Sequence, residues 1–249
     1  MNEFIVLMTA TIHTGLHSND MMRDDPDVRL CDYLNGLLFW GNLIDERIKG
    51  IVFCENSSAN LQPLKTACIN FNTPVEFLSF EGNSIPDGVH YGYAELGIID
   101  YAVLNSNLLK SCPYFIKVTG RLTFPRISNL LDSITFEFDA LVDHRRKYRS
   151  EKGFPIKSRT QIMILSREYY VQFLLGSRQE MIGHYSHIED FLAEKFSASM
   201  TQFKIVQRFK VECSPEGISR DNKNYSSFSV KCKKTLRCLL RRLYPDCWL

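Results

Sequence analysis

The chain has 249 residues, of which 45% are hydrophobic and 23% charged, and its net charge at pH 7 is +2. This composition is typical of a globular protein with a sizeable core, and its near-neutral charge gives no indication of a nucleic-acid partner. The eight cysteines lack the CxxC spacing of a zinc site, so we expect reduced thiols. No stretch approaches the ~20 apolar residues of a membrane span, and the N-terminal apolar run is too short for a signal peptide.

Strand-like apolar runs alternate with helix-like segments through the first 145 residues. A helix is predicted to open at Pro26, after two aspartates, with leucines at helical spacing behind it. A short helix is expected at 61–68 and a longer one at 94–109. Strands are predicted at 3–10, 50–55, 75–80, 114–119 and 134–142.

The second half has a less regular pattern. Residues 159–175 read as a strand that runs into a helix, 184–196 as an amphipathic helix, and 201–209 as a strand. A polar loop follows at 215–227. We expect one domain over 1–226 and a separate basic tail over 227–249.

Strand–helix alternation predicts an α/β fold of Rossmann type, with a mainly parallel sheet and helices on both faces. Ligands of such sheets bind outside the carboxyl ends of the strands. The expected rim is therefore formed by residues 9–13, 55–58, 80–82, 119–121 and 139–144.

The strand YFIKVT ends in Gly-Arg and contains a lysine, which an apolar strand normally excludes. Lys117 and Arg121 could neutralise a phosphate while Gly120 gives the backbone room to approach it. The alternative is a strand edge whose two cations are solvated. The spacing alone leaves both interpretations open.

Three further groups of polar residues are candidates for a ligand or catalytic site, and each has an ordinary structural explanation. Asp139 and Asp143 could hold Mg²⁺ or Mn²⁺, or could be a cap and a surface charge. The run from Glu55 through Asn56 to Ser57 suits ribose or base recognition, or a polar turn. Glu95 could act as a general base, or could favour the dipole of the helix that it opens.

The tail has the pattern of a basic amphipathic helix. Leucines 236, 239, 240 and 243 share one face, and a helix of this kind suits an anionic membrane surface. Packing of the same face on the protein's own body is the alternative. The residues expected to contact the membrane are Lys233, Lys234, Arg237, Arg241, Arg242 and Trp248.

Five motifs, in order through the first half of the chain, resemble a family of bacterial glycosyltransferases found in O-antigen and capsule gene sets. They are Thr9-Ala10-Thr11, Arg29 with Asp32-Tyr33, Glu55-Asn56-Ser57, Gly92 to Glu95, and Lys117 to Arg121. The sequence departs from the family pattern at Ala94, where a second glycine is expected. Weaker likeness continues at Asp143-His144-Arg145, Ser166–Tyr170 and Ile188-Glu189.

The resemblance implies a GT-A-like fold, with nucleotide-sugar binding in about 1–145 and the acceptor side in about 146–226. It implies transfer of a sugar from a nucleotide-sugar donor to a lipid-linked or growing surface polysaccharide, at the inner face of the cytoplasmic membrane. Donor contacts would come from Thr9, Thr11, Glu55, Asn56, Ser57, Lys117, Gly120 and Arg121. Catalytic carboxylates would be Glu95, Asp139 or Asp143, with Mn²⁺ or Mg²⁺ possible at the last two, and Arg145 and Glu189 would contact the acceptor or a phosphate.

Two other functions compete with this interpretation. One is a nucleotidylyltransferase on a similar fold, although such enzymes usually follow the first strand with a glycine-rich basic loop. Here TATIHTGLHSND contains one glycine and no lysine or arginine. The other is a non-catalytic scaffold that binds membranes through its tail.

Overall fold

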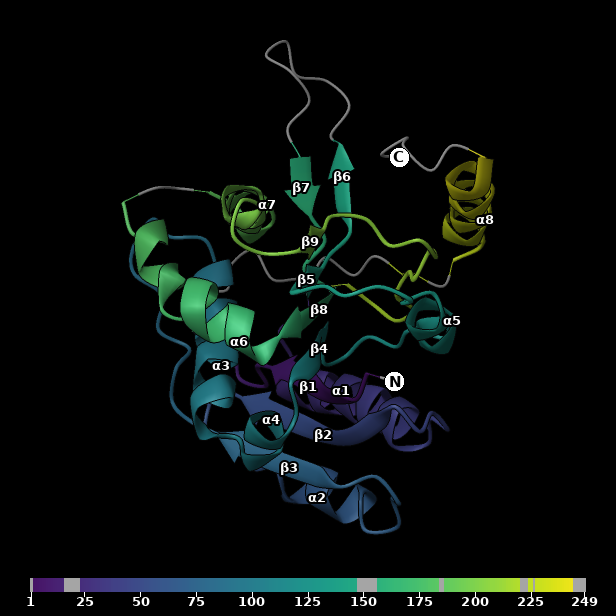
Figure 1. Ribbon diagram of the computed structural model, residues 1–249. Coiled ribbons are helices and arrows are strands. Elements are labelled where there is room, and N and C mark those ends of the chain that lie inside the picture. Colours follow the sequence, from purple (N-terminus) through teal and green to yellow (C-terminus); the bar gives the residue numbers. More distant parts are fainter. Residues whose placement is uncertain are drawn as a thin grey trace.

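A computed structural model describes residues 2–15, 23–146, 156–183, 186–219, 224–225 and 227–243. Its centre is a seven-stranded sheet in the order β3-β2-β1-β4-β8-β5-β9. Helices α3, α4 and α6 lie on one side of the sheet and α1 and α5 on the other (Figure 1). The predicted α/β architecture with helices on both faces is confirmed.

The four strands at the start of this order are parallel and follow the predicted runs closely. They are β1 (Phe4–Ala10), β2 (Ile48–Glu55), β3 (Val75–Ser79) and β4 (Tyr114–Thr119). Thr9 of β1 pairs with Cys54 of β2 on one side and with Thr119 of β4 on the other. The register therefore brings the carboxyl ends of β1, β2 and β4 to one edge.

The remaining strands are shorter and mixed in direction. β8 (Ile162–Ser166) runs antiparallel to both β4 and β5 (Ala140–Leu141), and β9 (Ile205–Val206) is parallel to β5. β6 (His144–Arg146) and β7 (Ile156–Ser158) form a separate antiparallel pair.

The helices have the following bounds. They are α1 (Pro26–Gly41), α2 (Gln62–Ala67), α3 (Gly92–Asn105), α4 (Asn107–Ser111), α5 (Ile127–Asp132), α6 (Arg167–Tyr169), α7 (Ile188–Ser199) and α8 (Phe228–Leu243). A π-helical turn at Tyr170–Leu174 continues α6, and a 3-10 turn follows at Ser177–Met181.

Apolar side chains cover both faces of the sheet, which explains why β1 reads as an unbroken apolar run. Val6 and Met8 pack in a cluster with Trp40 of α1. Ile5 and Leu7 pack in a second cluster with α3 residues such as Leu96. Successive β1 side chains point to opposite faces, so each layer of helices buries half of the strand.

The structure corrects three predicted elements. The strand expected at 134–142 is reduced to Ala140–Leu141, because the preceding phenylalanines 136 and 138 pack against the core from an irregular segment. The strand expected at 201–209 is reduced to Ile205–Val206. The helix expected at 94–109 is two helices, because Ser106 leaves the helical conformation at ψ 130° and caps α4 through Leu109 N–H.

Candidate active site

A cavity of about 310 Å³ lies at the carboxyl ends of β1 and β4. Residues from both halves of the chain line it. They are Thr9, Ala10, Thr11, Thr14, Gly15, Arg29, Tyr33, Asn83, Ile85, Tyr91, Ala94, Glu95, Ile98, Thr119, Arg121, Leu122, Thr160, Gln161, Glu189, Ser219 and Tyr225. This is the edge at which ligands of parallel α/β sheets bind.

The loop after β1 forms one wall of the cavity, and α1 holds its backbone. Arg29 is buried and donates from Nε to the Thr11 carbonyl at 2.7 Å. The Tyr33 hydroxyl accepts from Thr11 N–H at 2.9 Å. Arg29 and Tyr33 belong to the motifs quoted above, but their role in positioning Thr11 could not be predicted from the sequence.

The acidic and amide groups that follow β2 hold the same loop from the other side. The buried Glu55 carboxylate accepts Ile12 N–H at 3.0 Å and Ala59 N–H at 3.1 Å. Asn56 Oδ1 accepts from the Thr11 hydroxyl at 2.7 Å, and Ser57 Oγ accepts His13 N–H at 2.9 Å. Glu55, Asn56 and Ser57 lie outside the cavity lining, so they shape the wall behind the threonines.

Lys117 lies beneath the cavity. Its side chain is fully buried, and its ammonium group donates to the Glu95 carboxylate and, at 2.6 Å, to the Thr160 carbonyl. Both acceptors belong to residues that line the cavity. The buried charge of Lys117 is therefore paired within the protein. Lys117 lies behind the cavity wall and orients Glu95 and Thr160, which line it.

Gly120 is needed for helix packing at the end of β4. A Cβ on Gly36 of α1 would lie 2.0 Å from the Gly120 carbonyl oxygen, and a Cβ on Gly120 would lie 3.0 Å from the Thr9 carbonyl oxygen. The two glycines let α1 approach the strand end closely. Gly120 lies outside the lining, whereas the next residue, Arg121, enters it.

Two polar atoms at the cavity are buried without a hydrogen-bond partner among the described residues. They are Arg121 Nε, a donor, and Gln161 Oε1, an acceptor. Buried polar groups are nearly always satisfied, so these two atoms are candidate contacts for a ligand. Arg121 would offer a cationic donor to an anionic ligand. Gln161 and Thr160 were not predicted from the sequence, because no motif contains them.

Two carboxylates face the cavity from different helices. Glu95 lies in the first turn of α3, and Glu189 in the first turn of α7. Burial raises the pKa of the Glu189 carboxyl, and the charge of Glu95 adds to the rise. A carboxylate with a raised pKa is a stronger base than an ordinary carboxylate and is suited to accepting a proton.

The other predicted acids and Arg145 lie away from the cavity. Asp139 accepts Lys204 N–H at 2.7 Å, where β5 approaches β9. Asp143 is fully buried in ion pairs with Arg159 at 3.1 Å and Arg145 at 3.8 Å. None of these residues lines the cavity. Among the described residues, the two aspartates therefore have separate structural partners.

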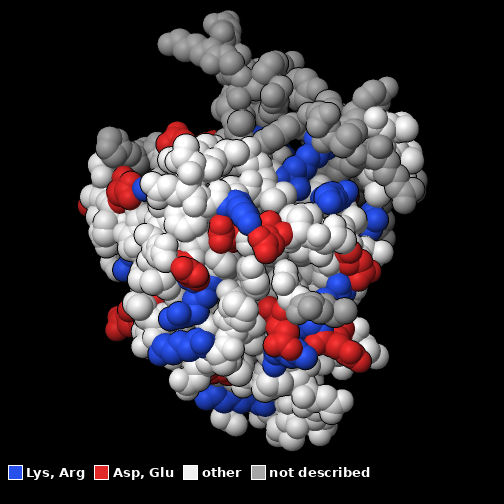
Figure 2. Space-filling model, viewed as in Figure 1, with Lys and Arg blue, Asp and Glu red and all other residues white. Residues whose placement is uncertain are grey.

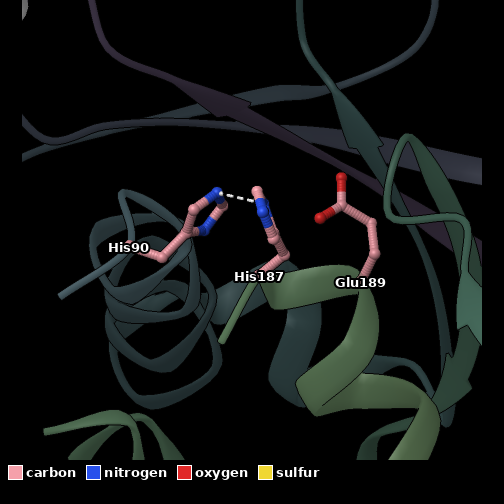
Figure 3. Close-up of side chains that lie close together, drawn as sticks. All are labelled: His90, His187 and Glu189. Atoms are coloured by element: carbon pink, nitrogen blue, oxygen red, sulfur yellow. Dashed lines mark hydrogen bonds between the residues drawn. The ribbon is translucent and has the colours of Figure 1, made fainter. Parts of the chain in front are cut away.

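Within the described ranges, one group of side chains is spaced to hold a metal ion: His90, His187 and Glu189, with ligand atoms within 4.8 Å of one another (Figure 3). The hydrogen bonds of His90 argue against this use. Its Nδ1 accepts N–H groups of Gly92 at 3.1 Å and Ile188 at 3.4 Å, and its Nε2 lies 3.1 Å from His187 Nδ1.

An acceptor Nδ1 fixes the neutral His90 ring with its proton on Nε2, from which it donates to His187. A metal ion bound at Nε2 would require the ring proton to move to Nδ1. There it would face the N–H groups of Gly92 and Ile188, which are donors and cannot accept it. A histidine that binds a metal ion through one ring nitrogen normally donates the N–H of its other ring nitrogen to an acceptor. The group does not fit a metal ion, and His90 ties together the first turns of α3 and α7, which carry the two cavity carboxylates.

Replacing His90 by Ala is expected to reduce the free energy of unfolding by about 1–3 kcal/mol, because two buried N–H groups lose their acceptor. His90→Asn, which keeps a carbonyl oxygen, should restore part of the loss. Urea unfolding of both variants, with exposed His13→Ala as control, measures this. A melting temperature that Zn²⁺ raises in the wild type but not in His90→Ala would contradict the exclusion of a metal.

Comparison with known proteins identifies the fold. No protein-family model matches the sequence, and no curated protein matches it. The inositol-1-phosphate CTP transferase of T. maritima superposes with a TM-score of 0.52 at 14% identity, over 94% of this chain and 96% of that one. The 4-diphosphocytidyl-2C-methyl-D-erythritol synthase of Anaerococcus prevotii DSM 20548 gives 0.50 at 8% identity, over 94% and 96%.

The chain therefore has the fold of these nucleotidyltransferases, which is the GT-A-like architecture that the sequence resemblance implied. At such low identity the likeness concerns the fold alone. The finer assignment, to surface-polysaccharide glycosyltransferases, does not follow from these matches.

The predicted tail is a helix, α8, which lies beside α5 (Figure 1). Lys233, Lys234, Arg241 and Arg242 are positions on this helix whose side chains are not described, and Trp248 lies outside the described residues. Among the described helices, none combines the length and apolar character that crossing a bilayer requires.

Proposed function

We propose that the protein is a transferase that takes a group from a nucleotide-activated donor bound in the cavity at the ends of β1 and β4. The observation that carries the proposal is Arg121, whose buried Nε has no hydrogen-bond partner among the described residues and which shares the cavity with two carboxylates. A cation beside a proton acceptor serves a reaction in which a phosphate leaves and a hydroxyl attacks.

The donor contacts divide into two kinds. Thr9, Thr11 and Arg121 line the cavity and would touch the nucleotide or its phosphates. Glu55, Asn56, Ser57, Lys117 and Gly120 would act by holding those groups in place. Positive charge at Arg121 would stabilise the charge that grows on the leaving phosphate in the transition state.

Glu189 is our candidate for the general base. Its raised pKa suits proton removal from an attacking hydroxyl, whereas Lys117 holds the Glu95 carboxylate in an ion pair. Glu95, oriented by Lys117, would then contact the substrate. The scheme uses no metal ion, and assays with and without Mn²⁺ or Mg²⁺ test whether the reaction depends on one.

Two forms of transfer could use a nucleotide held in this cavity, and only transfer to a hydroxyl needs the general base. The names of both structural neighbours favour nucleotidylyl transfer, in which a sugar or alcohol phosphate attacks a nucleoside triphosphate. The sequence motifs and two acids in the lining favour glycosyl transfer from a nucleotide sugar. The stretch TIHTGLHSNDMM, residues 11–22, contains no lysine or arginine that would neutralise the charge of a triphosphate. We prefer glycosyl transfer to a lipid-linked acceptor at the inner membrane face.

The two forms release different products. Nucleotidylyl transfer from a triphosphate and a sugar phosphate releases pyrophosphate, whereas transfer from a nucleotide-diphosphate sugar releases a nucleoside diphosphate. Incubation with each donor class, with and without Mn²⁺, and analysis by ³¹P NMR separates them. Pyrophosphate release would replace our preferred form by nucleotidylyl transfer, and no turnover or binding of either class would contradict both.

Replacing Arg121 by Ala is expected to weaken nucleotide binding about 10- to 100-fold, the loss of a charge-assisted hydrogen bond of about 1.5–3 kcal/mol. Calorimetric titration of the nucleotide into both proteins measures the ratio. Arg126→Ala is the matched control, because Arg126 is exposed and lies outside the cavity. Equal losses in the two variants would show a nonspecific charge effect.

A further inference from the structure

Helix α8 turns apolar side chains towards solvent. Leu236, Leu239 and Leu243 are 57%, 52% and 70% exposed. Their spacing of three and four residues puts them on one side of the helix, and we call them the leucine stripe. Amphipathic helices of globular proteins normally bury such a stripe against the core. Packing on the protein's own body, one of the two uses expected from the sequence, therefore does not occur for these leucines.

The opposite side of α8 faces the protein. Cys238 is half-buried, and Arg126, at the start of α5, donates to its Sγ at 3.0 Å. Arg237 is half-buried as well. Leu240 is half-buried too. The helix thus rests on the body through these half-buried side chains and presents the leucine stripe outward.

The charge of α8 has a single sign. The helix carries Lys231, Lys233, Lys234, Arg237, Arg241 and Arg242 within Phe228–Leu243, and that stretch contains no Asp or Glu. On the face of the molecule drawn in Figure 2, in contrast, basic and acidic side chains are mixed. An exposed apolar stripe on an acid-free helix calls for a partner that is both apolar and anionic.

We propose that α8 docks the protein on an anionic lipid bilayer, with the leucine stripe inserted at the level of the head groups. Sixteen residues give a helix about 24 Å long, at 1.5 Å per residue, so α8 would lie in the interface plane. A bilayer provides apolar depth for the leucines and anionic head groups for the lysines and arginines. Nucleic acid would leave the leucines in water, and a second copy of α8 would oppose six cations with six cations.

Vesicle co-sedimentation of the full chain tests the proposal and does not depend on the proposed enzymatic function. The wild type should bind vesicles of phosphatidylglycerol and phosphatidylcholine at least 10-fold more tightly than vesicles of phosphatidylcholine alone. Half a molar NaCl should weaken that binding at least 10-fold. Substitution of all three stripe leucines by Ser should weaken it at least 10-fold at low salt.

The matched control is Leu104→Ser, which removes a leucine of similar exposure, 53%, from α3. It should bind vesicles as the wild type does. The triple variant changes exposed positions, and a thermal melt checks that it folds; Lys233→Glu with Lys234→Glu provides a second variant expected to lose binding. Unchanged vesicle binding in both α8 variants would overturn the proposal. So would a wild-type dimer, seen by light scattering, that the leucine substitutions convert to a monomer.

Discussion

Replacing Glu189 by Gln is expected to lower the rate of transfer by about 10²- to 10⁴-fold, the usual contribution of a general base. The amide has nearly the same shape but cannot accept the proton, so nucleotide affinity should change little. Because burial and Glu95 raise the pKa of Glu189, the wild-type rate should fall at a pH above the ordinary carboxyl range as the solution becomes more acidic. This acid limb should be absent from the residual activity of the variant.

Asp190→Asn is the matched control for this experiment. Asp190 is the next residue in α7 and pairs with Lys157 at 2.9 Å, outside the cavity lining. It should keep the wild-type rate and pH profile. A full rate in Glu189→Gln, or an unchanged acid limb, would remove Glu189 from the role of base and leave Glu95 as the cavity carboxylate to test next.

Replacing Lys117 by Ala should reduce the free energy of unfolding by about 3–5 kcal/mol, the usual cost of removing one partner of a buried ion pair. The fully buried Lys117 leaves a space, and the Glu95 carboxylate and Thr160 carbonyl lose their donor. Denaturant unfolding followed by tryptophan fluorescence measures the loss. Lys117→Met combined with Glu95→Leu removes both charges while keeping much of the volume, and should be more stable than Lys117→Ala.

The same variants distinguish the two uses of Lys117. If the Lys117 side chain only holds the cavity wall in place, variants that remain folded should lose less nucleotide affinity than Arg121→Ala does. A stable Lys117→Ala protein with a severe loss of nucleotide affinity would instead indicate that Lys117 contacts the donor phosphates directly.

The parallel half of the sheet could be predicted because its strands are buried on both faces. Such strands have continuous apolar sequences, as in Phe4–Ala10. In an α/β fold, parallel strands also have their carboxyl ends on one edge of the sheet. The position of the cavity followed from that rule. β5 and β9 fall inside predicted strands that were too long. The short length of β5 could not be predicted, because phenylalanines 136 and 138 pack as core residues without joining the sheet.

The roles of individual site residues depend on contacts between distant segments, which a single sequence does not reveal. Lys117 was expected to face a phosphate, and its partner is Glu95 of α3. His90 and His187 meet only because α3 and α7 start side by side, where a Cβ on Gly92 would lie 2.3 Å from the Ile188 Cβ. The motif residues Glu55, Asn56 and Ser57 were correctly placed at the rim, but their hydrogen bonds turn inward to the neighbouring loop.

The central claim is that the cavity between Thr11, Glu95 and Arg121 holds a nucleotide. A crystal structure of the protein with the nucleotide that raises its melting temperature most tests this directly. We predict density for the nucleotide in that cavity, with a phosphate oxygen within hydrogen-bond distance of Arg121. A nucleotide bound elsewhere on the molecule, with this cavity filled only by water, would contradict the account.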